Sequence, residues 1–394
     1  MSKKMLAPTI ISIAMATVMA GAAISPAIGL IASNFPDADP VLIKLILTAP
    51  SLIIIPFSFI SSYLTTKISK RAIVMIGLTI YIVSGVGAQF TNTIGVLLAF
   101  RFVLGAGVGL VMPLSVSLIS DHFIGRQQVK MMGYSAAFCN LGGIVTMTLA
   151  GFLATFGWKV PFNVYWMGLG IFILVYFFLP KNEPVKPHGT GPKKKLPLTV
   201  YGYALASGSI MLAYYGIATN MAIYLEQGKI GGASVAGTVM SFSTVSGMIT
   251  SLILVQLQDV LKKYLIPVSL LLMGLAFGSL AMTSSIPVIL ASVCAAGLGQ
   301  GILFPLINVK ALSLVNPLNS DRVIAVVSSC IYIGQFSSPL VLDSIARSMG
   351  HPTIRFQYFF IGSALVLSVV IMAIVSILLK SKNGPSLRAE DPAA

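Results

Sequence analysis

Long apolar stretches recur along the whole chain and constrain its fold more than any other feature. A membrane-spanning helix needs about 20 apolar residues, and twelve such stretches can be read in the 394 residues. Only 9% of the residues are charged, whereas a soluble domain has about a quarter. The stretches lie near residues 6–32, 41–64, 73–91, 94–119, 130–155, 160–179, 200–225, 233–256, 265–283, 286–312, 322–345 and 356–379. The sequence therefore predicts an all-α polytopic membrane protein with twelve transmembrane helices.

The basic residues predict the orientation of these helices. With a cytoplasmic N-terminus, 19 of the 25 Lys and Arg residues fall in inner segments, five in outer segments, and Arg101 within a stretch. Cytoplasmic loops of membrane proteins carry such an excess. We therefore expect both termini in the cytoplasm. The net charge of +15 then faces anionic lipid, and nucleic-acid binding is not needed to explain it.

One segment is repeated at half the length of the chain. Residues 105–116 read GAGVGLVMPLSV and residues 297–308 read GLGQGILFPLIN, at an offset of 192. The same offset relates Lys130 to Arg322 and Gly142 to Gly334. Six stretches in each half predict a parallel repeat of two pseudo-symmetric six-helix bundles. The expected organisation is a bundle over 1–180, a cytoplasmic linker over 181–199, a second bundle over 200–380 and a cytoplasmic tail over 381–394.

Several motifs resemble the major facilitator superfamily, and most of all its twelve-helix drug:proton antiporters. Residues 25–28 (SPAI) and 47–52 (LTAPSL) are similar to that group's first two helices. Residues 62–71 (SYLTTKISKR) resemble its loop signature Gly-x-x-x-Asp-Arg-x-Gly-Arg-Arg, and Arg101-Phe102 resembles its fourth-helix signature. The resemblance implies a secondary transporter whose helices 1, 4, 7 and 10 surround a central cavity.

The chain departs from that group at informative places. Ser62, Thr66 and Ser69 replace the first Gly, the Asp and the second Gly of the loop signature. Residues 146–151 (TMTLAG) lack the Gly-Pro of the fifth-helix antiporter signature. The family's loop carboxylate latches the two halves in one state, so the latch here must be weaker or built differently.

Two groups of residues are expected to carry motion and coupling. The repeated glycines and prolines allow close helix contact and kinks, and they serve either packing alone or the bending of helices as access alternates. Arg101 is a charge deep in an apolar stretch, where it serves proton coupling or holds an anionic group, or else snorkels toward the outer headgroups. Asp343 is the best proton-carrying candidate among the ten acids. The conformational candidates are Gly105, Gly109, Pro113, Gly297, Gly301, Pro305, Lys67, Lys70 and Arg71, and the coupling candidates are Arg101 and Asp343.

Polar residues inside apolar stretches are candidates for the wall of a substrate cavity. For each one a bond to a neighbouring helix is the alternative to a bond with substrate. The missing mid-membrane carboxylate favours neutral or anionic substrates over cations. The candidates are Thr17, Ser25, Asn140, Tyr214, Tyr215, Asn220, Gln300, Asn308, Ser328, Tyr332 and Gln335.

Together these observations predict a monomeric secondary active transporter in the cytoplasmic (inner) membrane of a bacterium. It would export small amphiphilic molecules against proton entry, with substrate, protons and membrane lipid as partners and no cofactor or metal. The alternative is a proton-coupled uptake symporter or a facilitator for an organic anion or sugar. An enzyme is not expected, because no His, Cys or paired carboxylates converge at one membrane depth.

Overall fold

The computed structural model describes residues 5–124, 126–180, 196–315 and 320–382, and within these ranges the chain is helical without a strand. The predicted linker 181–199 and tail 381–394 lie mostly outside the described residues. The α-helices of the first half are α1 (Leu6–Ala22), α2 (Ile28–Asn34), α3 (Pro40–Leu64), α4 (Lys70–Gly87), α5 (Ile94–His122), α6 (Arg126–Leu153) and α7 (Met167–Phe178). Those of the second half are α8 (Leu198–Gln227), α9 (Ala233–Leu252), α10 (Leu254–Leu261), α11 (Leu265–Met282), α12 (Ile286–Leu312), α13 (Ser320–Ser348) and α14 (Ile354–Lys382).

Each of the twelve apolar stretches lies on helix, as predicted. Eleven of the described helices, or runs of adjoining helices, are long and apolar enough to cross a membrane. The tyrosines and Asn220 of α8 lower its hydropathy, and α8 is not among the eleven. The all-α polytopic fold is therefore confirmed, while the twelve spans and the cytoplasmic termini stay predictions.

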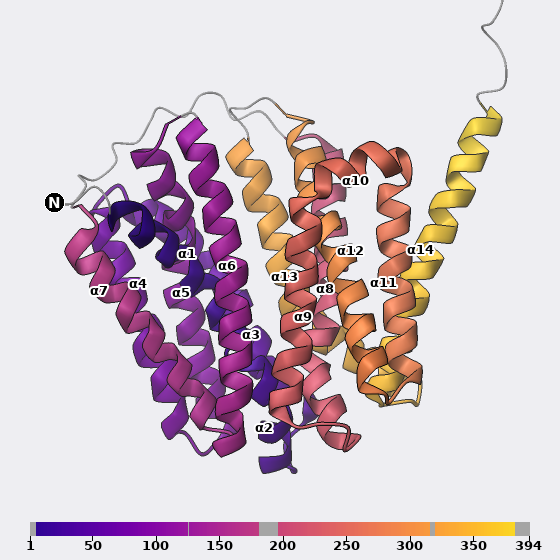
Figure 1. Ribbon diagram of the computed structural model, residues 1–394, viewed down its shortest axis with the longest axis horizontal. Helices are drawn as coiled ribbons and strands as arrows, with labels where there is room; N and C mark the ends of the chain where they lie inside the picture. Colours follow the sequence, from indigo (N-terminus) through magenta and orange to yellow (C-terminus); the bar gives the residue numbers. More distant parts are fainter. Residues whose placement is uncertain (1–4, 125, 181–195, 316–319, 383–394) are drawn as a thin grey trace, which may run out of the picture.

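The two halves pack their helices in the same way (Figure 1). In the first half α1 packs against α6, and α3 against α5. In the second half α8 packs against α13, and α9 against α12. These pairs correspond under the offset of 192. The halves meet through α6 with α9 and through α3 with α13, which again are corresponding pairs.

The repeated glycines permit these close contacts. A Cβ added at Gly105 would lie 2.5 Å from the Pro50 carbonyl oxygen of α3. At the matching position Gly297 in α12, an added Cβ would collide with the Ser243 carbonyl oxygen of α9. Gly109 and its mate Gly301 face the same neighbours, α3 and α9 respectively. Pro113 and Pro305 lie inside α5 and α12. The glycine pattern is thus a close-packing device in both halves, while its part in helix motion stays a prediction.

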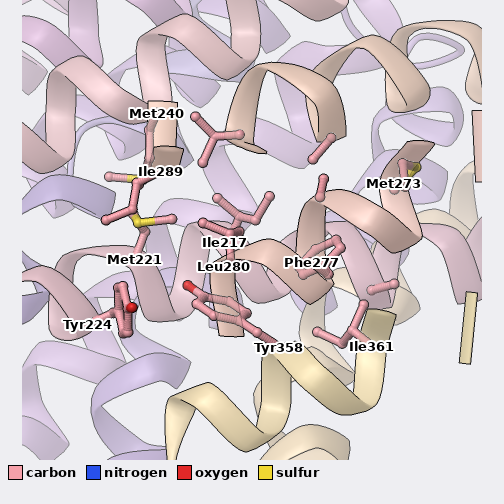
Figure 2. Packing of buried hydrophobic residues seen from close by; sticks show 14 of the residues in the cluster. Ile217, Met221, Tyr224, Met240, Met273, Phe277, Leu280, Ile289, Tyr358 and Ile361 are labelled. Atoms are coloured by element: carbon pink, nitrogen blue, oxygen red, sulfur yellow. The ribbon is translucent and has the colours of Figure 1, made fainter. Parts of the chain in front are cut away.

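Apolar side chains fill the interior of each half. Figure 2 shows the larger cluster of the second half, in which Phe277 and Tyr358 lie among Leu280 and Ile361. Tyr358 is fully buried, with its ring centroid 5.9 Å from that of Phe277 and 5.8 Å from that of Tyr224. Packing of this kind stabilises each half as a bundle of its own.

The halves are joined near one end of the bundle, which we call the distal end. It carries the turns at residues 35–39 and 349–353 and lies opposite the terminal end, where α1 begins (Figure 1). Here Ser25 Oγ donates a hydrogen bond to the Ala218 carbonyl oxygen at 2.8 Å. The hydroxyls of Thr148 in α6 and Ser241 in α9 are 3.1 Å apart. These contacts close the interface between the halves on the distal side.

Candidate functional site

A central cavity of about 440 Å³ lies between the two halves, on the terminal side of the distal contacts. This volume is within the range of about 300–1,000 Å³ that is typical of small-molecule sites. Its wall is drawn from both halves, including Pro50 of α3, Met147 of α6, Met240 of α9 and Phe304 of α12. The predicted cavity residues that line it are Thr17, Ser25, Asn140, Tyr214, Tyr215, Gln300, Tyr332 and Gln335.

Three predicted cavity residues lie elsewhere. Asn220 is fully buried and donates through its amide nitrogen to Gln357 Oε1 at 3.0 Å. Asn308 donates to the Phe304 carbonyl oxygen one turn earlier in α12, at 2.9 Å. Ser328 shares a helix face with Tyr332 but lies one turn closer to the terminal end, outside the lining. For Asn220 and Asn308, the bond within the protein takes the place of a bond to substrate.

The polar groups of the cavity wall fall into two kinds. Some are already paired inside the protein: Ser51 Oγ donates to Gln335 Oε1 at 2.8 Å, and the Tyr214 hydroxyl lies 3.0 Å from Ser243 Oγ. The others have no hydrogen-bond partner for their polar side-chain atoms among the described residues: these are Asn140, Tyr215 and Gln300. All three residues are half-buried. They are therefore the groups that are free to bind a ligand.

Arg101 is buried behind the wall of this cavity, with 1% of its surface exposed. Its Nε donates to the Ile46 carbonyl oxygen at 2.8 Å, and Nη2 donates to the Ala20 carbonyl oxygen at 3.0 Å. Nη1 donates to the Tyr165 hydroxyl at 2.5 Å. Ala20 lines the cavity, whereas Arg101 does not. The burial rules out an interfacial, snorkelling position, and the role of Arg101 in coupling stays a prediction.

A buried ion pair joins the halves at the distal end. Lys44 Nζ of α3 lies 2.7 Å from both carboxylate oxygens of Asp343 in α13, and the two residues are 2% and 7% exposed. Gln357 Nε2 of α14 also donates to Asp343 Oδ1, at 2.8 Å. Asn220 completes the network through Gln357.

The partner of Asp343 was missed by sequence reasoning. Lys44 was counted among the charges of an outer segment, although it lies inside the apolar stretch 41–64. Asp343 lies equally close to the outer end of the stretch 322–345. Two opposite charges, each a few residues from the outer end of its apolar stretch, were the available signal. Arg347, which follows Asp343 at i+4 in the sequence, pairs with Asp39 instead.

A second hollow, the distal vestibule, opens over this pair. It has a volume of about 560 Å³ and lies between the distal ends of the two halves. Its charged lining residues are Lys44, Glu226, Asp343, Arg347 and Arg355. At its rim Arg347 binds Asp39 through two hydrogen bonds of 2.5 and 3.2 Å. The hydrogen bonds from Arg347 lower the pKa of Asp39 below its usual value of 3.8.

The basic residues at the terminal end bind within the first half. Lys70 Nζ lies 2.6 Å from Asp121 Oδ2 and 2.5 Å from Ser117 Oγ, both in α5. Arg71 donates to the Tyr176 carbonyl oxygen of α7 at 2.5 Å, while Lys67 is exposed. Asp121 thus supplies Lys70 with a carboxylate at this end of the bundle, although the chain has Thr66 in place of the signature's Asp. This contact joins α4 to α5, and a latching role for Lys67, Lys70 and Arg71 stays a prediction.

Curated relatives match a part of the chain. It is 32% identical over 147 residues to the quinolone resistance protein NorA of Staphylococcus aureus (strain Mu50 / ATCC 700699), which is 37% of each chain. It is 25% identical over 134 residues to the multidrug transporter protein MdtP of Bacillus subtilis (strain 168), covering 34% of this chain and 24% of that protein. The matched segments thus span less than two fifths of either relative.

Solved structures match almost the whole fold. A bacterial homologue of the human lysosomal transporter Spinster, in an inward-facing and unoccupied conformation, has a TM-score of 0.72 at 15% identity and covers 95% of this chain and 96% of that one. A POT family transporter in complex with 5-aminolevulinic acid has a TM-score of 0.76 at 10% identity, covering 93% and 95%. Such identities support the fold alone.

The family model for the Major Facilitator Superfamily matches residues 10–339 and 203–393. These ranges include both copies of the glycine-proline segment, the cavity-lining helices and the distal ion pair. The expectation of a transporter of this fold, and not an enzyme, is confirmed. The chain belongs to the Major Facilitator Superfamily.

Proposed function

We propose that this protein is a secondary active exporter of small amphiphilic molecules, driven by proton entry. The observation that carries the proposal is the central cavity, which lies between two packed halves and is closed on one side by contacts between them. Transport proceeds by alternating access: the distal contacts separate, the terminal side closes, and the cavity changes the face to which it opens.

The character of the cavity wall supports an amphiphilic substrate. Its methionines, Met147, Met211, Met240 and Met248, are flexible apolar side chains that adapt to differently shaped ligands. The aromatic side chains of Tyr215 and Phe304 add apolar area. The resemblance to NorA, a quinolone resistance protein, and to MdtP, a multidrug transporter protein, supports export as the direction.

Asp343 is proposed as the proton-responsive group. As a carboxylate it holds Lys44 of the other half at 2.7 Å and keeps the distal end closed. It lines the distal vestibule, so a proton from the distal side reaches it when the halves begin to part. A neutral Asp343 no longer attracts Lys44 electrostatically, which favours separation. Arg101 is proposed to link this event to the cavity, because it bonds α3 at Ile46 and α1 at Ala20.

The proposed location is the cytoplasmic (inner) membrane of a bacterium, with both termini and the 181–199 linker in the cytoplasm. The excess of basic residues in the inner segments supports this orientation. In this orientation the terminal end is cytoplasmic and the distal end faces outward. The chain works as a monomer, because each half already supplies one side of the cavity.

Reconstituted vesicles test the proposal. The full chain is reconstituted into lipid vesicles, and a fluorescent amphiphilic substrate is added. Its movement across the bilayer is followed with and without an imposed pH gradient. We expect transport against a substrate gradient when the distal side is acidic, and its loss when an ionophore collapses the pH difference. Identical movement with and without the gradient would contradict proton coupling, and substrate accumulation in the same direction as the protons would favour a symporter.

A further inference from the structure

We propose, resting on the transport function above, that the central cavity selects uncharged amphiphiles that carry hydrogen-bonding groups and rejects permanent organic cations. Asn140, Tyr215 and Gln300 bind the polar groups of the ligand, and Arg101 sets the charge preference from behind the wall.

The lining of the central cavity has no charge among the described residues. Its polar members are hydroxyls and amides, contributed by serines, threonines, tyrosines, Asn140, Gln300 and Gln335. Neutral dipoles do not compensate the water that a cation loses on entering an apolar cavity. A carboxylate would compensate it, but the buried carboxylate of the interface, Asp343, lines the distal vestibule and is held by Lys44.

Arg101 adds a positive charge to this neutral surrounding. Its three hydrogen-bond partners are two backbone carbonyls and the Tyr165 hydroxyl, and none of the ion pairs among the described residues involves it. One of those carbonyls belongs to Ala20, which lines the cavity. A guanidinium remains charged in proteins, and its field in a low-dielectric interior is weakly screened. The cavity is therefore unfavourable for cations.

The three free polar groups come from different helices on both sides of the cavity. Asn140 is on α6 of the first half, whereas Tyr215 is on α8 and Gln300 on α12 of the second half. A ligand that binds Asn140 together with Gln300 therefore bridges the halves. An amide or a hydroxyl on the ligand both donates and accepts, so it satisfies these side chains without any net charge.

The residues proposed to set specificity differ between the two halves, whereas the glycines that pack the helices are the same in both. Under the offset of 192, Gln300 corresponds to Val108, Tyr215 to Ala23 and Arg101 to Val293. The glycines that pack α5 on α3 and α12 on α9 are common to both halves. Specificity is therefore placed at positions where the two halves differ.

Three probes that share a naphthalene body test the selection. One carries an acetamide, one a carboxylate and one a trimethylammonium group, and their binding to the purified full chain in detergent is measured by probe fluorescence. We expect saturable binding of the acetamide, and at least about 10-fold weaker binding of the ammonium probe, because a desolvated charge without a counter-charge is costly. Equal affinities for these two probes, or no saturable binding of the acetamide, would overturn the proposal.

A charge placed in the cavity sharpens the test. Gln300→Glu should strengthen binding of the ammonium probe by about 10-fold and weaken the carboxylate probe, since it supplies the missing counter-charge. Gln127→Glu is the matched control, because it makes the same change at an exposed position at the start of α6. If Gln300→Glu does not fold, Asn140→Asp makes the equivalent change on the other wall. An unchanged order of probe affinities in a folded cavity variant would also overturn the proposal.

These measurements need neither a membrane nor a pH gradient. Probe selection as expected, combined with an absence of gradient-driven transport, would refute the proposed exporter and leave the binding inference standing. Gradient-driven transport of the ammonium probe would instead support the proposed exporter and overturn the inferred selection against cations.

Discussion

The two hollows between the halves are similar in size, but one has an uncharged wall and the other a charged one. The central cavity has about 440 Å³ and a wall of uncharged side chains, whereas the distal vestibule has about 560 Å³ and five charged lining residues. They lie along the same interface and share α3, which places Pro50 in the cavity and Lys44 in the vestibule. This difference separates the recognition of substrate from the charges that close the interface.

The separation has a physical basis. A buried ion pair loses hydration on both partners, so it contributes little net stability but requires its partners to meet in one geometry. The Lys44–Asp343 pair therefore specifies the closed distal interface more than it strengthens the fold. A cavity that binds varied ligands needs the opposite character, with adaptable apolar groups and few fixed charges.

The largest expected effect comes from breaking the buried pair on one side only. Lys44→Met leaves Asp343 charged without a counter-ion, and we expect the free energy of unfolding to fall by about 3–5 kcal/mol. The double variant Lys44→Met/Asp343→Leu should recover most of the loss, because two apolar side chains need no compensation. Thermal unfolding of the purified chain measures both. Equal losses in the single and the double variant would contradict a compensated buried pair.

A smaller effect is expected where α3, the helix shared by both hollows, packs against α5. Gly105→Ala forces an added Cβ toward the Pro50 carbonyl oxygen, now 2.5 Å from that position, and should cost about 1–3 kcal/mol of unfolding free energy. The control is Gly95→Ala in the same helix, where an added Cβ meets nothing within 4 Å. We expect Gly95→Ala to be neutral or stabilising by up to about 1 kcal/mol. A similar loss in both variants would show that helix contact is not the cause.

The smallest effect is expected at the rim of the vestibule. Asp39 and Arg347 form a bidentate pair, but their side chains are 44% and 48% exposed, so Asp39→Asn should destabilise by only about 0.2–1 kcal/mol. The pKa of Asp39 is lowered in the folded chain, so its contribution is present above the ordinary value of 3.8 and is lost as the pH falls through the lowered value.

The difference between wild type and Asp39→Asn should therefore stay constant from about pH 8 to pH 5 and shrink only below about pH 4. Unfolding measured across this range checks the assignment. A difference that shrinks between about pH 7 and pH 6 would require a different titrating group.

The sequence predicted those features that rest on local pattern or on the repeat. Apolar length predicted the helices, and the matched glycines at Gly105 and Gly297 predicted close contact, because backbone approach depends on the missing side chain. The sequence also predicted which side of a helix faces the cavity, because Tyr332 and Gln335 both line it. Ser328 shares their face, but periodicity does not say how far along the helix the cavity extends.

Contacts between distant helices were harder to predict. Asp343 was singled out, but its partner Lys44 lies 299 residues away, and only the folded interface brings the two together. Asn220 is a polar residue in an apolar stretch, as expected of a cavity residue, yet its amide donates a hydrogen bond to Gln357 of α14. For Arg101 the depth in the helix was evident, whereas its binding to backbone carbonyls depends on where α1 and α3 pass.

The most direct test measures binding and coupling together in two variants, Asp343→Asn in the vestibule and Gln300→Leu in the cavity. Each is reconstituted in vesicles with the neutral naphthalene acetamide probe, and both probe affinity and transport under an imposed pH gradient are recorded. We predict that Asp343→Asn abolishes the response to the gradient and keeps probe affinity, whereas Gln300→Leu weakens affinity and keeps the response. A full gradient response in Asp343→Asn, or loss of both properties in each variant, would contradict the separation of recognition from closure.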